Sequence, residues 1–273
     1  MNKNRQIQIM GIVNLTLDSF FSNSRMLPKE KGDISLVIER IGAMIDDGAD
    51  IIDFGAVSTR PGASPVDEKQ EWERLSAVLK AARESFPKTT FSIDTTSSTI
   101  VRKAYEAIGP FIINDISAGE DDPKMLPLAG NLSLPYVAMH KRGNPQTMGS
   151  MTDYEDVTES VYSYFEDFSL KAELFGIMDW ILDPGFGFAK TVPQCYELLS
   201  NLGRFKSFGR KVLVGVSRKR MVTQPLGITP EEALEGTQVL NFAALERGAD
   251  ILRVHDVKEA VRTVSLYRQF FSI

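Results

Sequence analysis

The sequence contains a single cysteine, Cys195, among its 273 residues. One cysteine cannot form an internal disulfide bond or a cysteine metal cage, and its scarcity suits a reducing compartment, so we expect a cytoplasmic protein. We interpret Cys195 itself as a packing residue. No run of about 18 apolar residues and no apolar signal segment is present, so the sequence predicts neither a membrane span nor export.

An excess of basic residues is also missing, because the formal net charge is −5 at pH 7. The chain therefore lacks the positive field that nucleic acids and anionic membranes require, and we expect neither as a partner. HExxH, GxSxG and P-loop motifs are absent, and the two histidines, His140 and His255, lie in separate segments. A zinc centre is excluded by this pattern, and any metal should be a hard cation with oxygen ligands.

What the sequence does contain is a series of short apolar runs rich in β-forming residues. Their near-continuous apolarity is typical of strands buried on both faces of a parallel sheet. The eight runs are Ile7–Val13, Ile51–Phe54, Phe91–Ile93, Phe111–Ile113, Tyr136–Met139, Trp180–Leu182, Val212–Val216 and Ile251–Val254.

Helical patterns separate these runs. Apolar residues recur at helical spacing between Ile34 and Ile45 and again between Trp72 and Phe86. The segment Thr229–Glu232 has the residues of an N-cap, a first-turn proline and a capping-box glutamate, so we expect a long helix to begin there.

An internal echo indicates a repeated unit. The segment Gly48–Ile52 (GADII) returns as Gly248–Leu252 (GADIL), each a glycine that ends a helix and leads into a strand. Eight strand–helix alternations in this length, with no GxGxxG in the first turn, favour one (β/α)₈ barrel domain over a doubly wound sheet.

Polar residues gather directly after the predicted strands. In a barrel these positions meet at one mouth, the C-terminal face where barrel enzymes carry their chemistry. The residues are Asn14, Asp18, Thr59, Arg60, Asp94, Asn114, Asp183, Ser217, Lys219, Arg253 and His255. Each also has a structural explanation: Asp183–Gly185 suits a turn, Ser217–Arg220 a solvated helix face, and Asn114–Asp115 and His255–Asp256 could cap helices.

Chemical complementarity favours a binding site. Arg253 and His255 after the last strand, with Ser217–Lys219 after the one before, occupy the region where barrels bind phosphate. Asp94, Asn114 and Asp183 are short acceptors or amides suited to the N–H edge of a flat heterocycle such as a pterin.

The chain resembles the dihydropteroate synthase family from Ile9 to beyond His255. The matching segments, in order and each after a predicted strand, are IMGIVNLTLDSF (Ile9–Phe20), DIIDFGAVSTRPGA (Asp50–Ala63), SIDT (Ser92–Thr95), INDISAG (Ile113–Gly119), MHKRGNPQTM (Met139–Met148), LDPGFGFAKT (Leu182–Thr191), VGVSRKR (Val214–Arg220) and RVHDV (Arg253–Val257). The resemblance implies a (β/α)₈ barrel that condenses 6-hydroxymethyl-7,8-dihydropterin pyrophosphate with para-aminobenzoate, giving 7,8-dihydropteroate and pyrophosphate in folate biosynthesis.

The resemblance also implies roles for matching residues. Asp94, Asn114, Met139, Asp183, Gly215 and Lys219 would bind the pterin, and Asn14, Thr59, Arg253 and His255 the pyrophosphate. Thr59, Arg60, Pro61, Phe188, Ser217 and Lys219 would surround para-aminobenzoate, and Asn14 would help bind Mg²⁺. Asp94, Lys219 and Arg253 would be catalytic, and the loops Asn14–Gly32 and Gly55–Val66 would close over the substrates. A homodimer packed through late barrel helices and sulfonamide binding are further implications.

These residues suit the chemistry. Loss of pyrophosphate leaves a cation delocalised into the pterin ring, which a buried carboxylate at Asp94 would stabilise. Mg²⁺, Arg253 and His255 would stabilise the departing charge. The amine is neutral near pH 7, so no strong base is required.

The sequence departs from the family pattern at four positions. Leu17 replaces a usual proline, Ala56 and Val57 replace a Gly-Glu pair, and Ala189 replaces a glycine. Two rival hypotheses remain: a pterin-binding methyltransferase domain, which would need no pyrophosphate cluster, and a non-catalytic folate-pathway paralogue.

Overall fold

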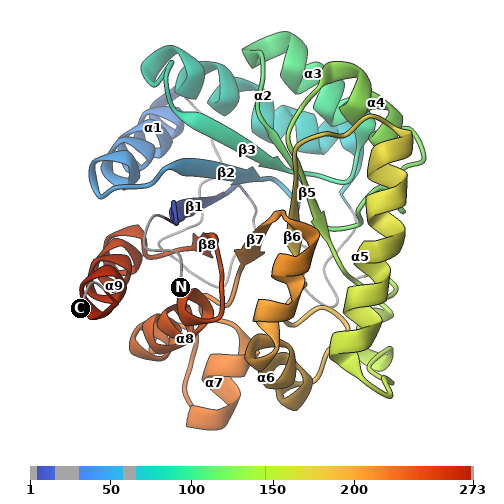
Figure 1. The fold of residues 1–273 in the computed structure, drawn as a ribbon. Coiled ribbons are helices and arrows are strands. Elements are labelled where there is room, and N and C mark those ends of the chain that lie inside the picture. The colour runs from blue at the N-terminus through green and yellow to red at the C-terminus, as the bar shows by residue number, and fades with distance from the viewer. Residues whose placement is uncertain (1–4, 16–30, 58–65, 145, 272–273) are drawn as a thin grey trace.

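The strands form a closed parallel barrel whose neighbours follow the order of the sequence (Figure 1). The structure, a computed structural model, describes residues 5–15, 31–57, 66–144 and 146–271. The strands are β1 (Gln8–Asn14), β2 (Ile51–Gly55), β3 (Thr90–Asp94), β4 (Ile112–Asp115), β5 (Tyr136–Met139), β6 (Trp180–Asp183), β7 (Lys211–Val214) and β8 (Ile251–Val254). The predicted α/β fold, a single (β/α)₈ barrel, is confirmed.

Helices surround the ring of strands. They are α1 (Lys31–Asp46), α2 (Glu68–Ser85), α3 (Ser98–Ile108), α4 (Met125–Leu132), α5 (Val157–Leu174), α6 (Val192–Ser200), α7 (Arg220–Leu226), α8 (Leu234–Glu246) and α9 (Val257–Phe270), with 3₁₀ turns η2 (Met148–Ser150) and η3 (Leu202–Phe208). Side chains cap several starts: Ser97 Oγ accepts from Ile100 N, and Thr191 with Gln194 forms a capping box at α6. Among the described residues, no helix is long and apolar enough to cross a bilayer.

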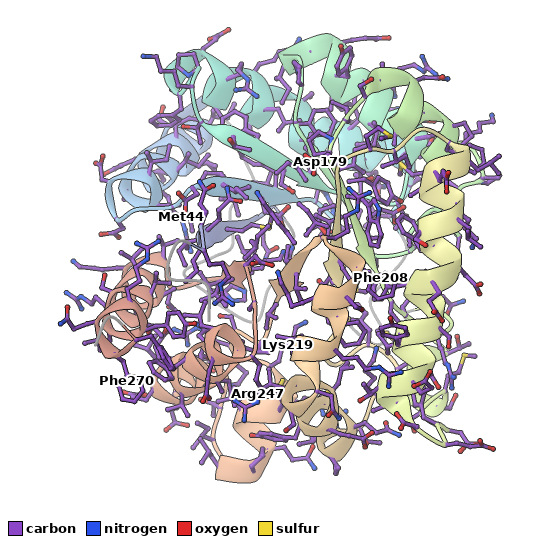
Figure 2. The ribbon with its side chains drawn as sticks, in the orientation of Figure 1. Met44, Asp179, Phe208, Lys219, Arg247 and Phe270 are labelled. Atoms are coloured by element: carbon purple, nitrogen blue, oxygen red, sulfur yellow. The ribbon has the colours of Figure 1, made fainter. Side chains whose placement is uncertain are left out.

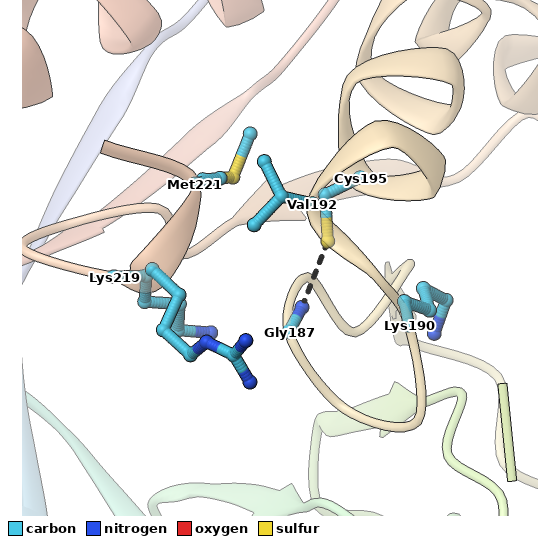
Figure 3. A pocket seen from close by; sticks show the side chains of 7 residues that line it. Gly187, Lys190, Val192, Cys195, Lys219 and Met221 are labelled. Atoms are coloured by element: carbon cyan, nitrogen blue, oxygen red, sulfur yellow. Dashed lines mark hydrogen bonds between the residues drawn. The ribbon is translucent and has the colours of Figure 1, made fainter. Parts of the chain in front are cut away.

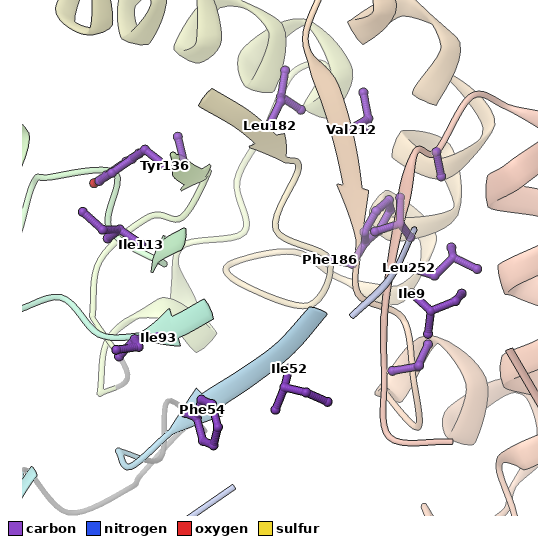
Figure 4. Close-up of a cluster of buried hydrophobic side chains, with 14 of the residues drawn as sticks. Ile9, Ile52, Phe54, Ile93, Ile113, Tyr136, Leu182, Phe186, Val212 and Leu252 are labelled. Atoms are coloured by element: carbon purple, nitrogen blue, oxygen red, sulfur yellow. The ribbon is translucent and has the colours of Figure 1, made fainter. Parts of the chain in front are cut away.

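The strands separate two apolar layers. An outer layer lies between the ring and the helices and includes Ile9, Ile52, Ile93, Ile113, Tyr136, Leu182, Val212 and Leu252 (Figure 4). The residues at alternate positions face the other way, into the barrel. There they form an apolar floor of Met10, Ile51, Ile112, Val137, Ile181, Leu213 and Ile251. The barrel interior is therefore packed below the mouth, and only the strand ends above the floor can hold a ligand.

The internal echo has a structural basis. The Asp50 carboxylate accepts the backbone N–H of Ile9 at 2.8 Å, and the Asp250 carboxylate accepts that of Val212 at 2.9 Å. Each aspartate thus satisfies a donor at the start of a neighbouring strand, at the barrel end opposite the mouth. Because that end serves stability in barrels, the repeated motif is structural.

The predicted helix start at Thr229 is wrong. The Glu232 carboxylate does accept from the backbone N of Thr229 at 2.9 Å, but the helix begins only at Leu234. Arg218 explains the delay, because its guanidinium binds the carbonyl oxygens of Pro230 (2.6 Å) and Glu231 (3.0 Å). Residues 229–233 form a turn instead, in which Glu232 N donates to the Thr229 carbonyl oxygen at 3.2 Å.

Candidate active site

The twofold alternation of the strands places the predicted polar residues inside the mouth. Several lie two residues after a floor residue of their own strand, as Asn114 follows Ile112 and Asp183 follows Ile181. The same spacing gives Met139, Gly215 and Arg253, and Asn14 lies four residues after Met10 on the same face of β1. The register adds Asp94, which pairs with Asn114. All these positions therefore reach one rim above the floor.

A buried charge network organises one side of this rim. Arg253 donates through Nε to Asp53 at 2.7 Å and through Nη2 to Asp94 at 2.6 Å. The Asn114 amide also donates to Asp53, at 3.2 and 3.3 Å. Asp53 is fully buried, and the Asp94 side chain is 13% exposed. Asp53 thus fixes the orientations of Arg253 and Asn114, and Arg253 in turn holds Asp94 at the rim.

Burial controls the protonation of these groups. It raises the pKa of Asp94 from 3.8 to about 7, with Arg253 opposing the rise and Asp53 reinforcing it. Burial also raises the pKa of Asp183, where Lys219 opposes the change. The pKa of Arg253 lies above its ordinary value although burial opposes this, because Asp53 and Asp94 favour the cation. The mouth therefore holds one carboxyl group, Asp94, whose pKa lies near neutral pH.

Lys219 lies on the other side of the mouth. Its ammonium donates to the Phe186 carbonyl oxygen at 2.8 Å and lies 5.1 Å from the centre of the Phe188 ring. Burial lowers the pKa of Lys219 to about 8, and Asp183 opposes this shift. Lys219 lines a cavity with Lys190 and Cys195, seen in Figure 3. The lysine can thus donate to a ligand edge or face an aromatic ring.

Ser217 and His255 are neighbours across strands β7 and β8. Ser217 Oγ lies 3.0 Å from His255 Nδ1 and accepts the His255 backbone N–H at 3.3 Å. Asp256 is the N-cap residue of α9, as the structural explanation of His255–Asp256 allowed, but its side chain makes no capping hydrogen bond. The Asp256 carboxylate instead binds the guanidinium of Arg218 at 2.7 and 2.9 Å.

Asn14 lies beside Asp94 across Gly55. A Cβ atom added to Gly55 would lie 3.5 Å from Asn14 Oδ1 and 3.8 Å from Asp94 Oδ2. The described residues contain no group of three or more His, Cys, Asp or Glu side chains that could hold a metal. One amide oxygen does fit a Mg²⁺ ion that takes its other ligands from a phosphate and water.

Sequence reasoning missed two central residues. Asp53 was not assigned a role, although a charged residue inside the apolar run of β2 is a signal that could have found it. Lys190 has its ammonium only 2.8 Å from His140 Nδ1. Its contacts depend on loop geometry, which the sequence did not indicate.

The remaining predictions for individual residues have mixed outcomes. The capping role of Asp115 is wrong, because its carboxylate accepts from the backbone N atoms of Ser117 and Gly119, well before α4. Cys195 is buried and accepts the Gly187 N–H at 3.3 Å, in agreement with packing. The predicted site residues Thr59, Arg60 and Pro61, the departure at Leu17, and the greater part of both predicted closing loops lie outside the described residues.

Comparison with known proteins decides the family. The model of the pterin-binding enzyme family matches residues 10–255. The chain is 38% identical over 258 residues to the dihydropteroate synthase of Escherichia coli (strain K12), covering 94% of this chain and 89% of the relative. The chain belongs to the dihydropteroate synthase family of pterin-binding enzymes.

Solved dihydropteroate synthases share the fold of this chain. The Yersinia pestis enzyme, in a sulfonamide drug complex, superposes with a TM-score of 0.90 at 33% identity, covering 98% of this chain and 94% of that one. The Xanthomonas albilineans enzyme with 4-aminobenzoic acid gives a TM-score of 0.88 at 31% identity, with the same coverage of 98% and 94%. The segments that carry the predicted site therefore fall within the part of the chain shared with this family.

Two departures from the synthase pattern lie among the described residues, one in a well-anchored backbone and one in a strained backbone. The carbonyl oxygen of the fully buried Ala56 accepts from Arg74 at 2.7 Å, which anchors the end of the β2 segment. Ala189 is buried with φ of 48°, a left-handed backbone conformation that a glycine would adopt without strain. It directly precedes Lys190.

Proposed function

We propose that this chain condenses 6-hydroxymethyl-7,8-dihydropterin pyrophosphate with para-aminobenzoate to form 7,8-dihydropteroate, releasing pyrophosphate. The observation that carries the proposal is the pairing of buried acceptors with cations at one rim: Arg253 binds Asp94 directly, and Asn114 shares Asp53 with it. Such a rim suits a flat, donor-rich heterocycle joined to an anion. The name of the E. coli relative supports the same activity.

The pterin would occupy the deep part of the mouth. Asp94 and Asp183 would accept its N–H groups, Asn114 would complete the polar edge, and Lys219 would donate to a ring acceptor. Met139, which pairs with Asp183 in the sheet, and Gly215 would pack against the ring. At Gly215 an added Cβ would lie 3.8 Å from Arg253 Cβ, so a larger residue would fill the space that a ring needs.

The pyrophosphate would lie near strands β8 and β1. Arg253 and His255 would donate to its oxygens, with Asn14 and Thr59 at the same end. Mg²⁺ bound by Asn14 and the substrate would neutralise the charge of the leaving group. If so, chelation with EDTA should abolish turnover and added Mg²⁺ should restore it, whereas turnover in excess chelator would refute the metal requirement.

The aromatic amine would bind over the β6 and β7 loops. Phe188, Ser217 and Lys219 would contact it, together with Thr59, Arg60 and Pro61. The 4-aminobenzoic acid and sulfonamide complexes of the two solved relatives support an aromatic amine as a substrate of this chain. The Phe188 ring beside the Lys219 ammonium offers both an aromatic face and a charge.

Catalysis would follow from charge placement. As the bond between the pterin methylene and the pyrophosphate oxygen breaks, positive charge develops on the pterin and negative charge on the leaving group. Asp94 would stabilise the first, and Arg253 and His255 the second. The neutral amine then attacks the methylene carbon and loses its proton to water, which explains why no dedicated base is needed.

The decisive test is a pyrophosphate-release assay with both substrates and Mg²⁺, with para-aminobenzoate omitted and then restored. Release that depends on both substrates supports a synthase. Binding of a methylated folate without pyrophosphate turnover would favour a methyltransferase domain. Absence of turnover in a correctly folded sample would favour a non-catalytic paralogue.

The outer faces of the last helices suit a homodimer. Val239 on α8 is 66% exposed, and Leu266 and Phe270 on α9 are 68% and 65% exposed. Figure 2 shows Phe270 at the outer edge of the helical ring. Apolar residues gathered on neighbouring helices suit an interface between copies. Light scattering should give twice the mass of 30.4 kDa, and a monomer would refute this.

A cytoplasmic location, which suits the free Cys195, is part of the proposal.

A further inference from the structure

Lys190 has an unusual environment for a lysine. It is 7% exposed, and its ammonium lies 2.8 Å from His140 Nδ1, 3.0 Å from the Gly185 carbonyl oxygen and 3.1 Å from the Phe188 carbonyl oxygen. An ammonium has three donors, and its three nearest acceptors converge on it at these distances, with the His140 carbonyl oxygen farther away at 3.5 Å. The segment between Gly185 and Lys190 therefore folds around a single buried nitrogen.

His140 is suited to be an acceptor in this arrangement. Burial lowers the pKa of His140 to about 2, with Lys190 adding to the shift, so the imidazole is neutral at pH 7. Its Nδ1 can then accept from Lys190 while Nε2 carries the proton. The ring is fixed by Tyr164, whose ring meets it edge-on with centroids 4.9 Å apart. The acceptor is thus held by the core rather than by the loop.

The loop around Lys190 also presents the groups that face the substrates. Phe186, between the two carbonyl acceptors, accepts from Lys219 at 2.8 Å, and Phe188 places its ring 5.1 Å from the Lys219 ammonium. The three nearest acceptors of the Lys190 ammonium, in His140, Gly185 and Phe188, all follow strands β5 and β6. Its influence is directed to the β6 and β7 side, where the aromatic amine would bind.

We propose that Lys190 is a positioning residue that shapes the β6 loop around its ammonium and thereby sets the places of Phe188 and Lys219 for the aromatic amine. The proposal deepens the proposed function and rests on it for the kinetic part of the test. Backbone strain at Ala189, with φ of 48°, shows that the loop adopts a costly conformation next to this anchor.

The test compares three variants of the full-length protein. Lys190→Met removes all three donors with little change in length, and Lys190→Arg keeps the charge but cannot place one nitrogen among three convergent acceptors. Lys171→Met, at an exposed lysine of α5, is the matched control. We expect both changes at Lys190 to raise the KM for para-aminobenzoate by about 100-fold, the scale of a misplacement near 1 Å. The KM for the pterin substrate should change by less than roughly 5-fold, and the control should match wild type.

Hydrogen–deuterium exchange provides a readout that does not depend on activity. Amides of residues 185–189 should exchange faster in both Lys190 variants than in wild type and in Lys171→Met. Equal changes of both KM values, or rescue by arginine, would overturn the positioning role and leave only a charge or stability effect. Unchanged exchange in both Lys190 variants would overturn the positioning role. This readout does not require activity, so a wild type that released no pyrophosphate would count against the proposed function alone.

Discussion

Replacing Asp94 by asparagine should move stability and activity in opposite directions. Because burial raises the pKa of Asp94 from 3.8 to about 7, the folded protein binds this proton more tightly than the unfolded chain. Ionisation of Asp94 therefore lowers the free energy of unfolding. This loss is absent below about pH 4, where the carboxyl is protonated in both states, and it increases up to about pH 7. Three pKa units correspond to roughly 4 kcal/mol at pH 8. Asparagine resembles the neutral acid and should remove this cost.

Activity should fall in the same variant. If Asp94 stabilises positive charge on the pterin, its loss should lower kcat by about 10²- to 10³-fold, as for other preorganised electrostatic groups. The test measures the free energy of unfolding in urea at pH 8 and pH 4.5, and the rate of pyrophosphate release at pH 8. It compares wild type, Asp94→Asn and the exposed control Asp179→Asn. Higher stability of Asp94→Asn at pH 8, shrinking at pH 4.5, is expected. A variant that is less stable at pH 8, or that retains a tenth of the activity, would refute the reasoning.

Three further predictions concern neighbouring groups. The value of kcat/KM should rise to about pH 7 as the Asp94 carboxyl ionises and fall above about pH 8 as Lys219 loses its proton. Rates measured from pH 5.5 to 9.5 should therefore give a bell-shaped profile. A profile that only rises or only falls would contradict this prediction. Gly185→Ala should destabilise by roughly 3 kcal/mol or more, because φ is +72° and the new Cβ would lie 2.0 Å from the His140 carbonyl oxygen. Gly109→Ala, with φ of +73° and open space, should cost only about 1 kcal/mol in the same urea titration, and equal costs would exclude the clash. Ala189→Gly should raise the unfolding midpoint by relieving about 1 kcal/mol of backbone strain, and a lowered midpoint would show that this strain is not limiting.

Periodicity in the sequence predicted the barrel because buried parallel strands leave a local signal. Runs such as Tyr136–Met139 and Ile251–Val254 were placed to the residue, since their apolarity ends where the strand does. The helix expected at Thr229 failed for a nonlocal reason. Arg218, eleven positions earlier, binds the backbone carbonyls that the helix would have required.

The site likewise contains residues that a local sequence pattern predicts and residues that depend on nonlocal contacts. Asp94 was found because it is polar and directly follows the predicted strand Phe91–Ile93, and Arg253 because it is a charged residue near the end of the last strand. The partnership that Asp53 makes with Arg253 spans 200 positions of the chain, and no local pattern encodes it. Lys190 depends on how a loop wraps around one nitrogen, which only the three-dimensional arrangement reveals.

The apolar floor from Met10 to Ile251 has a kinetic consequence. Within the part of the chain that the structure describes, this floor closes the centre of the barrel, so both reactants would pass the same opening. A ligand held at the Asp94 and Asn114 end would be covered by one lying over the β6 and β7 loops. The heterocycle must then arrive first, and an amine that binds early would obstruct it. Turnover should accordingly follow a compulsory order, with excess amine slowing the reaction.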